Sequence, residues 1–391
     1  MQTVFENGVL TLTLTGNVTG ANAPELEAEI YKVLEQLHPD AVVIDCDGVE
    51  YMSSSGLRVI LRVRQNVDQT SLIRVHPEFY EILETTGFTE MMEVQKAHRV
   101  VSVAGCELIG RGANGKIYRL DEENIIKVYT NTDSLPEIRH ERELSRAAFV
   151  LGVPTAIPYD VVMIAEGGYG SIYELLNAKT YVQLYNDGEK TLKELAEMSV
   201  ALLKLIHSRV VIQSFVPSAR DTTLGWFQIL RDDLPSEEVE KLCTLISALP
   251  DDMHMIHGDY HFRNLMYQNG ESLLIDMDKL SHGHPVFELA AIYNAYCGFG
   301  AVDHSVTKQF MGIDYETTVV LWRKILEGYL ETKEESTLQS IEDKVKVISY
   351  ARLMRHMIRE NEINTEAGRK QFAYYHAGLT ELLPRIDTLQ F

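Results

Sequence analysis

Residues 255–266 read MIHGDYHFRNLM and residues 273–278 read LLIDMD. A site for phosphoryl transfer needs a carboxylate that orients the attacking hydroxyl, together with oxygen ligands for Mg²⁺. Asp259, Asn264 and Asp276 supply these groups, and Asp259 and Asn264 stand five positions apart, as in catalytic loops that transfer phosphate. The apolar run before Asp276 predicts a short buried strand that delivers this side chain. We therefore expect Asp259 to be the catalytic carboxylate, and Asn264 and Asp276 to hold Mg²⁺.

The same stretch contains three histidines, which raises zinc as an alternative metal. His254, His257 and His261 fall within eight residues. Two histidines four positions apart suit zinc when a helix presents them on one face, and the expected His-Glu-x-x-His motif is absent. The hard oxygen donors favour Mg²⁺ instead.

Three glycines mark a second element upstream, at residues 107–120. Gly110, Gly112 and Gly115 form a Gly-x-Gly-x-x-Gly loop between two predicted strands. Glycines there let backbone N–H groups approach nucleotide phosphates without interference from a Cβ atom. A Rossmann fold would need a helix directly after the loop, whereas this sequence continues as a strand, so a glycine-capped hairpin is predicted.

The site around Asp259 resembles the aminoglycoside phosphotransferase and choline kinase family, whose fold is that of the protein kinases. That family carries His-Gly-Asp, as residues 257–259 do here, followed by the positions of Asn264 and Asp276. The family's aromatic-Asp-Leu-Ala helix start reads Phe-Glu-Leu-Ala at residues 287–290. Either carboxylate can lie in the first turn of a helix and meet its positive end. The resemblance implies ATP and Mg²⁺ as cofactors.

The resemblance also implies the remaining nucleotide contacts. Lys127 lies in an apolar strand, where an ammonium group needs an acidic partner from the helix that follows. Glu143 is the better match for that partner and Glu141 is the alternative. Glu174 to Leu176 should form the hinge whose backbone meets adenine.

The first hundred residues show another alternation of elements. Apolar runs flank Asn7-Gly8, a strong hairpin signal. Helical periodicity follows over residues 24–37, and a buried strand is predicted at residues 41–44. Another helix opens at the serines before Gly56, and residues 72–75 predict a further strand.

This order, with Asp45, the stretch YMSSSGL at residues 51–57 and Thr-Gly-Phe at residues 86–88, resembles the STAS domain of anti-sigma-factor antagonists. In that family an Asp-Ser-Ser-Gly-Leu element carries a regulatory phosphoserine, which falls on Ser54 here, while Ser53 replaces the preceding Asp. A phosphate on a helix N-terminus meets free backbone N–H groups. Serines are also good N-caps without any phosphate, so both interpretations stay open.

Composition narrows the classes of partner and location. A formal net charge of −21 argues against nucleic acid, which requires basic surface. The four cysteines lie far apart and form no Cys-x-x-Cys pair, so no disulfide framework is indicated. No signal peptide or apolar run of membrane-spanning length is visible, and we expect a cytoplasmic protein without a membrane partner.

The expected architecture is an α/β STAS-like domain with a mixed sheet at residues 1–98, followed by a bilobal α+β kinase-like domain at residues 99–391. Its N-lobe is expected at about 99–176 and its mostly helical C-lobe at about 177–391.

The expected function is transfer of the γ-phosphate of ATP to a hydroxyl of a small molecule. Analogy of fold suggests a cationic amino sugar or amino alcohol as acceptor. A serine protein kinase is one alternative, although little sequence for an activation segment stands between Asp276 and Glu288. Another is a nucleotide-binding regulatory protein that acts on partners through its STAS-like domain.

Overall fold

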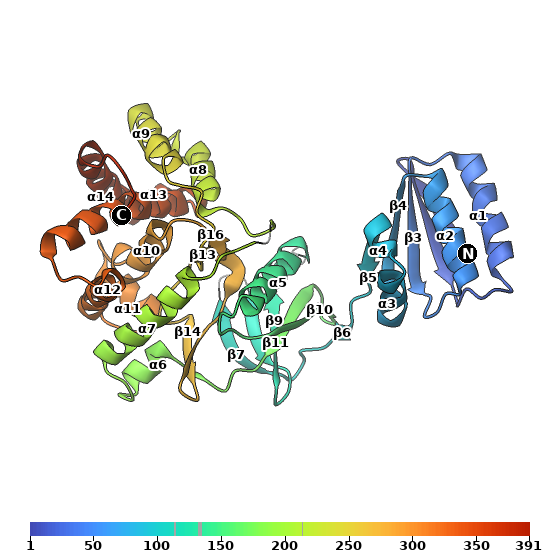
Figure 1. Cartoon of the computed structure of the whole chain (residues 1–391), viewed down its shortest axis with the longest axis horizontal. Helices are drawn as coiled ribbons and strands as arrows, with labels where there is room; N and C mark the ends of the chain where they lie inside the picture. Colours follow the sequence, from blue (N-terminus) through green and yellow to red (C-terminus); the bar gives the residue numbers. More distant parts are fainter. Residues whose placement is uncertain (113–114, 132–134, 213) are drawn as a thin grey trace. The chain divides into compact units, whose positions relative to one another are not determined.

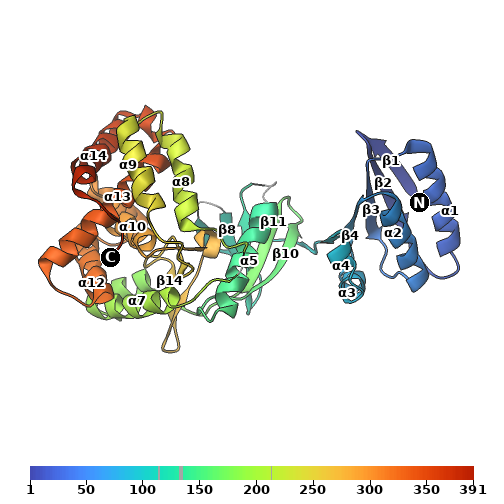
Figure 2. The ribbon, with the colours of Figure 1, turned by 45° about the horizontal axis from the view of Figure 1, so that its top comes forward.

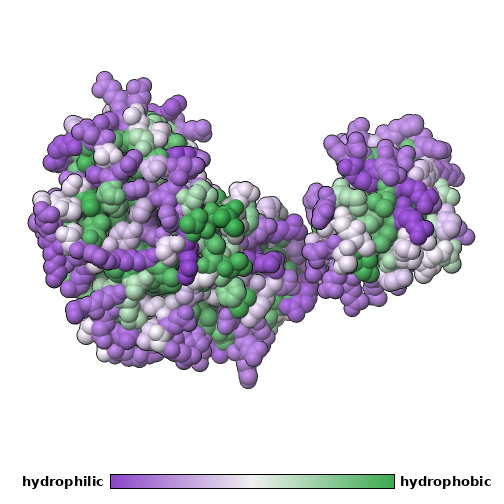
Figure 3. Space-filling model, viewed as in Figure 1, coloured by the Kyte–Doolittle hydropathy of each residue, from purple (hydrophilic) through white to green (hydrophobic). Residues whose placement is uncertain are grey.

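The computed structural model describes residues 1–112, 115–131, 135–212 and 214–391. The chain divides into two compact units, one of Met1–Ser102 with Val162–Ala165 and the other of Val103–Val161 with Glu166–Phe391 (Figure 1). Hydrophilic side chains cover much of the face shown in Figure 3. In the described ranges, no helix is both long enough and apolar enough to cross a bilayer.

The first unit is built on a mixed sheet with the strand order β1-β2-β3-β4-β5. Its strands are β1 (Gln2–Glu6), β2 (Val9–Thr15), β3 (Ala41–Gly48), β4 (Gln69–Val75) and β5 (Glu93–Lys96). β1 and β2 are antiparallel, and the other neighbours are parallel. Asn7 and Gly8 both have positive φ, 50° and 81°, which the tight turn of the expected hairpin requires.

Four helices complete this unit: α1 (Ala23–Leu37), α2 (Ser54–Asn66), α3 (Pro77–Thr85) and α4 (Phe88–Met91). Buried residues alternate along β2, where Leu10, Leu12 and Leu14 are buried and their neighbours are not. One face of the sheet therefore carries the core, which includes Ile30 of α1 and Phe79 of α3. The unit thus has a hydrophobic core of its own.

The second unit begins with a sheet-rich lobe, in which β11, β9, β8 and β7 are neighbours in that order. Its elements are β7 (Glu107–Gly112), β8 (Gly115–Arg119), β9 (Asn124–Tyr129), α5 (Leu135–Val150), the first part of β10 (Pro158–Ile164) and β11 (Tyr169–Glu174). The short strand β6 (Val100–Val101) and the end of β10 fall within the ranges of the first unit. β7, β8 and β9 form successive antiparallel pairs. The glycine loop therefore joins two strands of a hairpin.

The rest of this unit is mainly helical, as expected for the larger lobe. Its helices are α6 (Tyr181–Asn186), α7 (Leu192–His207), α8 (Ala219–Leu230), α9 (Ser236–Ser247), α10 (Val286–Tyr293), α11 (His304–Met311), α12 (Tyr315–Leu330), α13 (Glu335–Arg359) and α14 (Glu366–Leu382). Thr191 and Glu194 form a capping box that starts α7. The α/β unit followed by a two-lobed α+β unit confirms the expected fold class.

Short strands in the larger lobe frame the stretch around Asp259. β13 (Met255–Ile256) precedes it and pairs with β16 (Ser281–His282). β14 (Leu265–Gln268) follows it and forms a hairpin with β15 (Glu271–Leu274), while β12 (Lys179–Thr180) pairs with the other side of β14. We call residues 257–264, between β13 and β14, the catalytic loop.

Candidate active site

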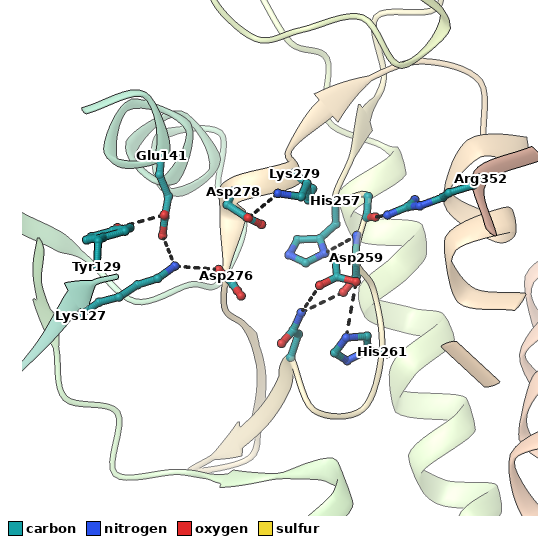
Figure 4. A network of polar contacts seen from close by, with 12 residues as sticks. Lys127, Tyr129, Glu141, His257, Asp259, His261, Asp276, Asp278, Lys279 and Arg352 are labelled. Atoms are coloured by element: carbon teal, nitrogen blue, oxygen red, sulfur yellow. Dashed lines mark hydrogen bonds and ion pairs between the residues drawn. The ribbon is translucent and has the colours of Figure 1, made fainter. Parts of the chain in front are cut away.

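Asp259 lies in the catalytic loop with its carboxylate held by neighbours from the same loop (Figure 4). The Asn264 side-chain amide donates to the backbone carbonyl of Asp259 over 2.9 Å and to its Oδ2 over 3.3 Å. His261 Nε2 lies 3.5 Å from Asp259 Oδ1. These contacts fix the carboxylate relative to Asn264.

The surroundings of Asp259 favour its charged form. Burial raises the pKa of this carboxyl, but the hydrogen bond from His261 and the charges of His257, His261 and Arg352 lower it, and the net pKa lies well below the ordinary value. Asp259 is therefore an anion at neutral pH. An ionised carboxylate can accept a hydrogen bond from an attacking hydroxyl and receive its proton as the new P–O bond forms.

Glu288, at the start of α10, holds the backbone of the catalytic loop. Its fully buried carboxylate accepts the N–H groups of His257 and Gly258 over 2.5 and 3.0 Å. Burial raises the pKa of Glu288, but His207, whose Nε2 lies 3.8 Å away, His257 and the backbone N–H of His257 outweigh burial, so the net pKa is lowered. Glu thus takes the place of the expected Asp as an ionised anchor for backbone N–H groups.

Gly258 is required by its surroundings. Its φ is +80°, a conformation that favours glycine. A Cβ atom at this position would lie 2.7 Å from the carbonyl oxygen of Lys279, which is too close for any side chain. The second position of His-Gly-Asp is therefore fixed by packing against the segment after Asp276.

The hairpin of β14 and β15 brings Asp276 beside the catalytic loop. Leu265 pairs with Leu274, and the backbone N–H of Ile275 donates to the Asn264 carbonyl over 3.0 Å. Asp276 follows at a positive φ of 65°, which turns the chain into a short 3₁₀ helix. The predicted metal ligands Asn264 and Asp276 therefore come from adjacent ends of one hairpin.

The donors present are suited to Mg²⁺. Because the Asn264 amide nitrogen donates to Asp259, its amide oxygen is directed to other partners, and Asp276 adds a carboxylate. Mg²⁺ prefers such hard oxygen ligands together with water and phosphate oxygens. Within the described ranges, no three His, Cys, Asp or Glu side chains converge as metal ligands.

The three histidines proposed for zinc contact different partners. His254 Nδ1 lies 2.5 Å from Asp252, His257 Nε2 lies 3.2 Å from the Ile275 carbonyl, and His261 contacts Asp259. They do not form one ligand set, so the geometry does not favour zinc.

Lys127 joins the small lobe to the hairpin that carries Asp276. Its Nζ lies 2.7 Å from Glu141 Oε1 and 3.2 Å from Asp276 Oδ1 (Figure 4). Burial lowers the pKa of Lys127, but the charges of Asp276 and Glu141 raise it by a larger amount. The net pKa therefore lies above the ordinary value. Lys127 is therefore a fixed cation, of the kind that binds nucleotide phosphates.

The expected pairing of Lys127 with Glu143 is wrong, since the partner is Glu141. Glu141 is buried on the face of α5 that also carries Ile138 and Leu144, whereas Glu143 is exposed. Two positions turn a helix by roughly 200°, so the two glutamates cannot share a face. Tyr129 Oη also donates to Glu141, over 2.9 Å.

The glycines of the predicted loop and the residues of the predicted hinge lie in, or directly after, strands of the small lobe. Gly112 pairs with Gly115 across β7 and β8, and the two residues between them lie outside the described ranges. A Cβ on Gly115 would lie 2.2 Å from the Val128 carbonyl oxygen, so the close strands exclude any side chain there, while Gly110 has only ordinary contacts. Glu174 ends β11 and Leu176 lies in the segment that leads to β12.

Ser54 is the first residue of α2 and is exposed. Ser53 caps the helix, since its hydroxyl accepts the Gly56 N–H over 3.4 Å. The capping role therefore falls to Ser53, and the Ser54 hydroxyl is accessible at the N-terminal end of the helix.

Sequence reasoning missed Arg352, which lies in α13, 94 residues from its partner. Its Nη2 donates to the Gly258 carbonyl over 2.8 Å. No motif marks this arginine. The only signal in the sequence is a row of arginines at helical spacing, Arg352, Arg355 and Arg359.

Two families match the chain by sequence. Residues 105–310 match the phosphotransferase enzyme family, and residues 1–101 match the STAS domain. A curated relative is BtrV of Bordetella bronchiseptica, whose name describes an anti-sigma factor antagonist. It is 32% identical over 102 residues, which cover 25% of this chain and 87% of BtrV.

Solved structures of aminoglycoside phosphotransferases are similar in fold. APH(2'')-Ib bound to ADP is 17% identical, covers 80% of this chain and 99% of its own, and gives a TM-score of 0.49. A thermostable mutant of APH(4)-Ia with AMP-PNP and hygromycin B is 12% identical, covers 72% of this chain and 93% of its own, and gives a TM-score of 0.50. At these identities the likeness concerns the fold alone.

Proposed function

The chain belongs to the phosphotransferase enzyme family and begins with a STAS domain, and on that basis we propose that it transfers the γ-phosphate of ATP to a hydroxyl of a small molecule in the cytoplasm. One observation carries the proposal: Lys127 contacts both Glu141 and Asp276, so the small lobe and the metal-binding hairpin share one ion-pair network. Such a lysine links nucleotide phosphates to the metal in phosphoryl transfer.

Each residue of the site has a distinct task in the reaction. Lys127 binds phosphate oxygens, and backbone N–H groups near Gly112 and Gly115 approach them from the loop. Glu174 and Leu176 offer backbone groups for adenine. Asp259 orients the acceptor hydroxyl and takes its proton while the oxygen forms a bond to the γ-phosphorus and the bond to the β-phosphate oxygen breaks, which releases ADP.

Asn264 and Asp276 would hold Mg²⁺ through oxygen donors. The ion supplies positive charge that neutralises the phosphates during transfer. The protein's own part is to keep both ligands in place, through the bond from Asn264 to Asp259 and the backbone bond from Ile275 to Asn264.

A regulatory role for the STAS domain is the second part of the proposal. Ser54 is exposed at the start of α2, and Ser53 already caps that helix. A phosphate on Ser54 would add about −1.5 to −2 charge at a helix end that favours anions. Phosphorylation would then release an acidic protein partner from this surface.

The decisive experiment measures ADP production by the full chain with Mg²⁺-ATP across a panel of hydroxyl compounds. Acceptor-dependent ADP release that is lost in Asp259→Asn supports the function. No turnover with any acceptor, while Mg²⁺-ATP binds normally, would favour the nucleotide-binding regulatory alternative. Transfer only to serine in peptides would favour the protein kinase alternative.

A further inference from the structure

Three arginines lie on one face of α13, next to the catalytic loop. Arg352, Arg355 and Arg359 are spaced by three and four positions, which places them together on a helix. Arg352 donates to the Gly258 carbonyl, so the row begins beside Asp259 (Figure 4). These residues lie beyond residues 105–310, the range matched by the phosphotransferase family.

Arg352 acts on the Asp259 carboxylate by its charge, but none of the three guanidinium groups forms an ion pair with a described residue. Among the residues that the structure describes, no carboxylate lies within 4.0 Å of Arg352, Arg355 or Arg359, although the chain has a formal net charge of −21. Burial lowers the pKa of Arg355, and the positive charges of Arg359 and Arg352 lower it further. Mutual repulsion of this kind is relieved by an anion placed between the cations.

The contacts of the Arg355 side chain also favour binding of an anion. Its guanidinium lies over the ring of Trp226, 5.2 Å from the centroid. Its Nε is buried and has no hydrogen-bond partner within the described part of the chain. A buried N–H donor without a partner is costly, and an anion would satisfy it.

Helix α8 packs beside Arg355. Trp226 belongs to α8, which packs against α13 in both ribbon views (Figure 2).

In the catalytic loop, the exposed Arg263 donates from Nη1 to the Phe310 carbonyl and places its guanidinium group over the Phe310 ring. A fourth guanidinium, hydrogen-bonded to Phe310 but without a carboxylate within 4.0 Å among the described residues, therefore lies in the catalytic loop itself.

We propose that the acceptor is a hydroxyl compound that also carries an anionic group, a phosphate or a carboxylate, which binds Arg355 and Arg359 while its hydroxyl faces Asp259. This inference rests on the proposed phosphotransferase function and names its substrate class. Arginine binds such oxyanions through paired, charge-assisted hydrogen bonds. Arg352 positions the catalytic loop through Gly258 and adds positive charge near Asp259.

The acceptor class differs from the cationic amino sugar or amino alcohol that the family resemblance suggests. The positive charges of Arg352, Arg355 and Arg359 would repel an ammonium group placed beside them. A cationic acceptor is therefore the outcome that contradicts the inference.

Binding of inorganic phosphate to the full chain provides a test that needs no turnover. The nucleotide site is first saturated with Mg²⁺-AMP-PNP, so that phosphate cannot compete there, and ionic strength is kept constant. We expect calorimetry to detect phosphate binding and the Arg359→Gln variant to weaken it about tenfold, the loss of one charge-assisted contact. Arg359 is exposed, so this variant should fold, and Arg385→Gln serves as the control because Arg385 is exposed but pairs with Glu381.

The second test compares the kinetics of phosphate transfer to four acceptors, which are glycerol, glycerol 3-phosphate, glycerate and choline. We expect the two anionic compounds to exceed glycerol and choline in kcat/KM, and Arg355→Gln with Arg359→Gln to reduce this preference about tenfold or more. Higher activity with glycerol 3-phosphate than with glycerate identifies phosphate as the anion, and the reverse identifies a carboxylate.

The inference is overturned if phosphate binds equally to Arg359→Gln and to the unchanged chain, or if choline is the preferred acceptor. Failure of the proposed function looks different. In that case Asp259→Asn leaves ATP turnover unchanged. The effect of Arg359→Gln on phosphate binding does not depend on turnover, so it can be judged separately.

Discussion

Asn264 donates its side-chain amide to the backbone carbonyl of Asp259 over 2.9 Å, and this bond ties a candidate metal ligand to the candidate catalytic residue. The amide can point its nitrogen in only one direction, so its oxygen faces away from Asp259. The bond therefore sets the orientation of both groups before a metal or substrate binds.

Replacement of Asp259 tests the catalytic assignment. Asp259→Asn keeps the size of the side chain but removes the proton acceptor, so kcat should fall by roughly two to four orders of magnitude while Mg²⁺-ATP still binds. Steady-state ADP release and a nucleotide-binding titration measure the two properties. Asp232→Asn, at an exposed position on the surface, is the matched control. Equal turnover in both variants would remove Asp259 from the catalytic role.

The Lys127 network distinguishes the two glutamates of α5. Glu141→Gln should lower kcat/KM for ATP about ten- to hundredfold, because Lys127 loses its buried charged partner. Glu143→Gln should stay within about twofold, since Glu143 is exposed. Lys127→Ala should weaken ATP use at least as much as Glu141→Gln. Comparable losses in Glu143→Gln and Glu141→Gln would contradict the geometry.

Metal removal tests the roles of Asn264 and Asp276. Chelation should abolish ADP release, and Mg²⁺ or Mn²⁺ should restore it because both accept hard oxygen ligands. Asp276→Asn should raise the Mg²⁺ concentration needed for half-maximal activity, since one anionic ligand is lost. Restoration by Zn²⁺ but not by Mg²⁺ would revive the zinc interpretation.

Phosphorylation of Ser54 is the prediction for the STAS domain. We expect protein isolated from cells to show an added phosphate on the peptide that contains Ser54, and Ser54→Asp to weaken binding of its protein partner. Incubation with Mg²⁺-ATP followed by intact-mass measurement tests whether the chain modifies itself. If Ser54 is unmodified in both samples and Ser54→Asp binds the partner fully, the regulatory role is contradicted. The serines would then serve only the end of the helix, which Ser53 caps.

The STAS domain should lose stability at acidic pH through Asp45. Burial raises the pKa of this carboxyl, but hydrogen bonds from Arg74 and the Asp47 N–H outweigh it, so the net pKa lies below the ordinary value. The pKa of this carboxyl is about 4 in the unfolded chain and lower in the folded domain. The ionised carboxylate therefore stabilises the folded domain at pH values above about 4, and this stabilisation is lost as the pH falls through the folded-state pKa.

Arg74→Ala should therefore shift the acid unfolding of this domain to higher pH. Hydrogen exchange of the backbone amides in β3 and β4 of the full chain gives a local measurement. Arg58→Ala, at an exposed position of α2, is the control. If the acid transition of Arg74→Ala is unchanged, the ion pair between Arg74 and Asp45 does not contribute to the stability of the domain at acidic pH.

The sequence predicted local features well and distant contacts poorly. The Asn7-Gly8 hairpin, the strand before Asp276 and the pairing of the two strands that flank the glycine loop depend on neighbours in the chain, and the structure confirms them. The strand before Asp276 is less buried than expected, since only Leu274 is fully buried. The preference for Glu143 over Glu141, which rested on the resemblance to the family, is wrong. The helical period through Ile138 and Leu144 would have placed Glu141 inside.

Arg352 could not be predicted, because its contact with Gly258 depends on how α13 packs. Helical periodicity indicates which residues share a face but not which loop that face meets. For the same reason, only the folded chain shows that Arg355 and Arg359 have no carboxylate within 4.0 Å among the described residues.

Gly258 separates this protein from the protein kinases by geometry. Their motif has arginine where this chain has glycine. Here a side chain at position 258 would collide with the Lys279 carbonyl and displace the turn that carries Asp276. A single mutation from His-Gly-Asp to His-Arg-Asp would therefore damage the metal site, so evolution between the two motifs requires a coordinated change in the segment from Asp276 to Lys279.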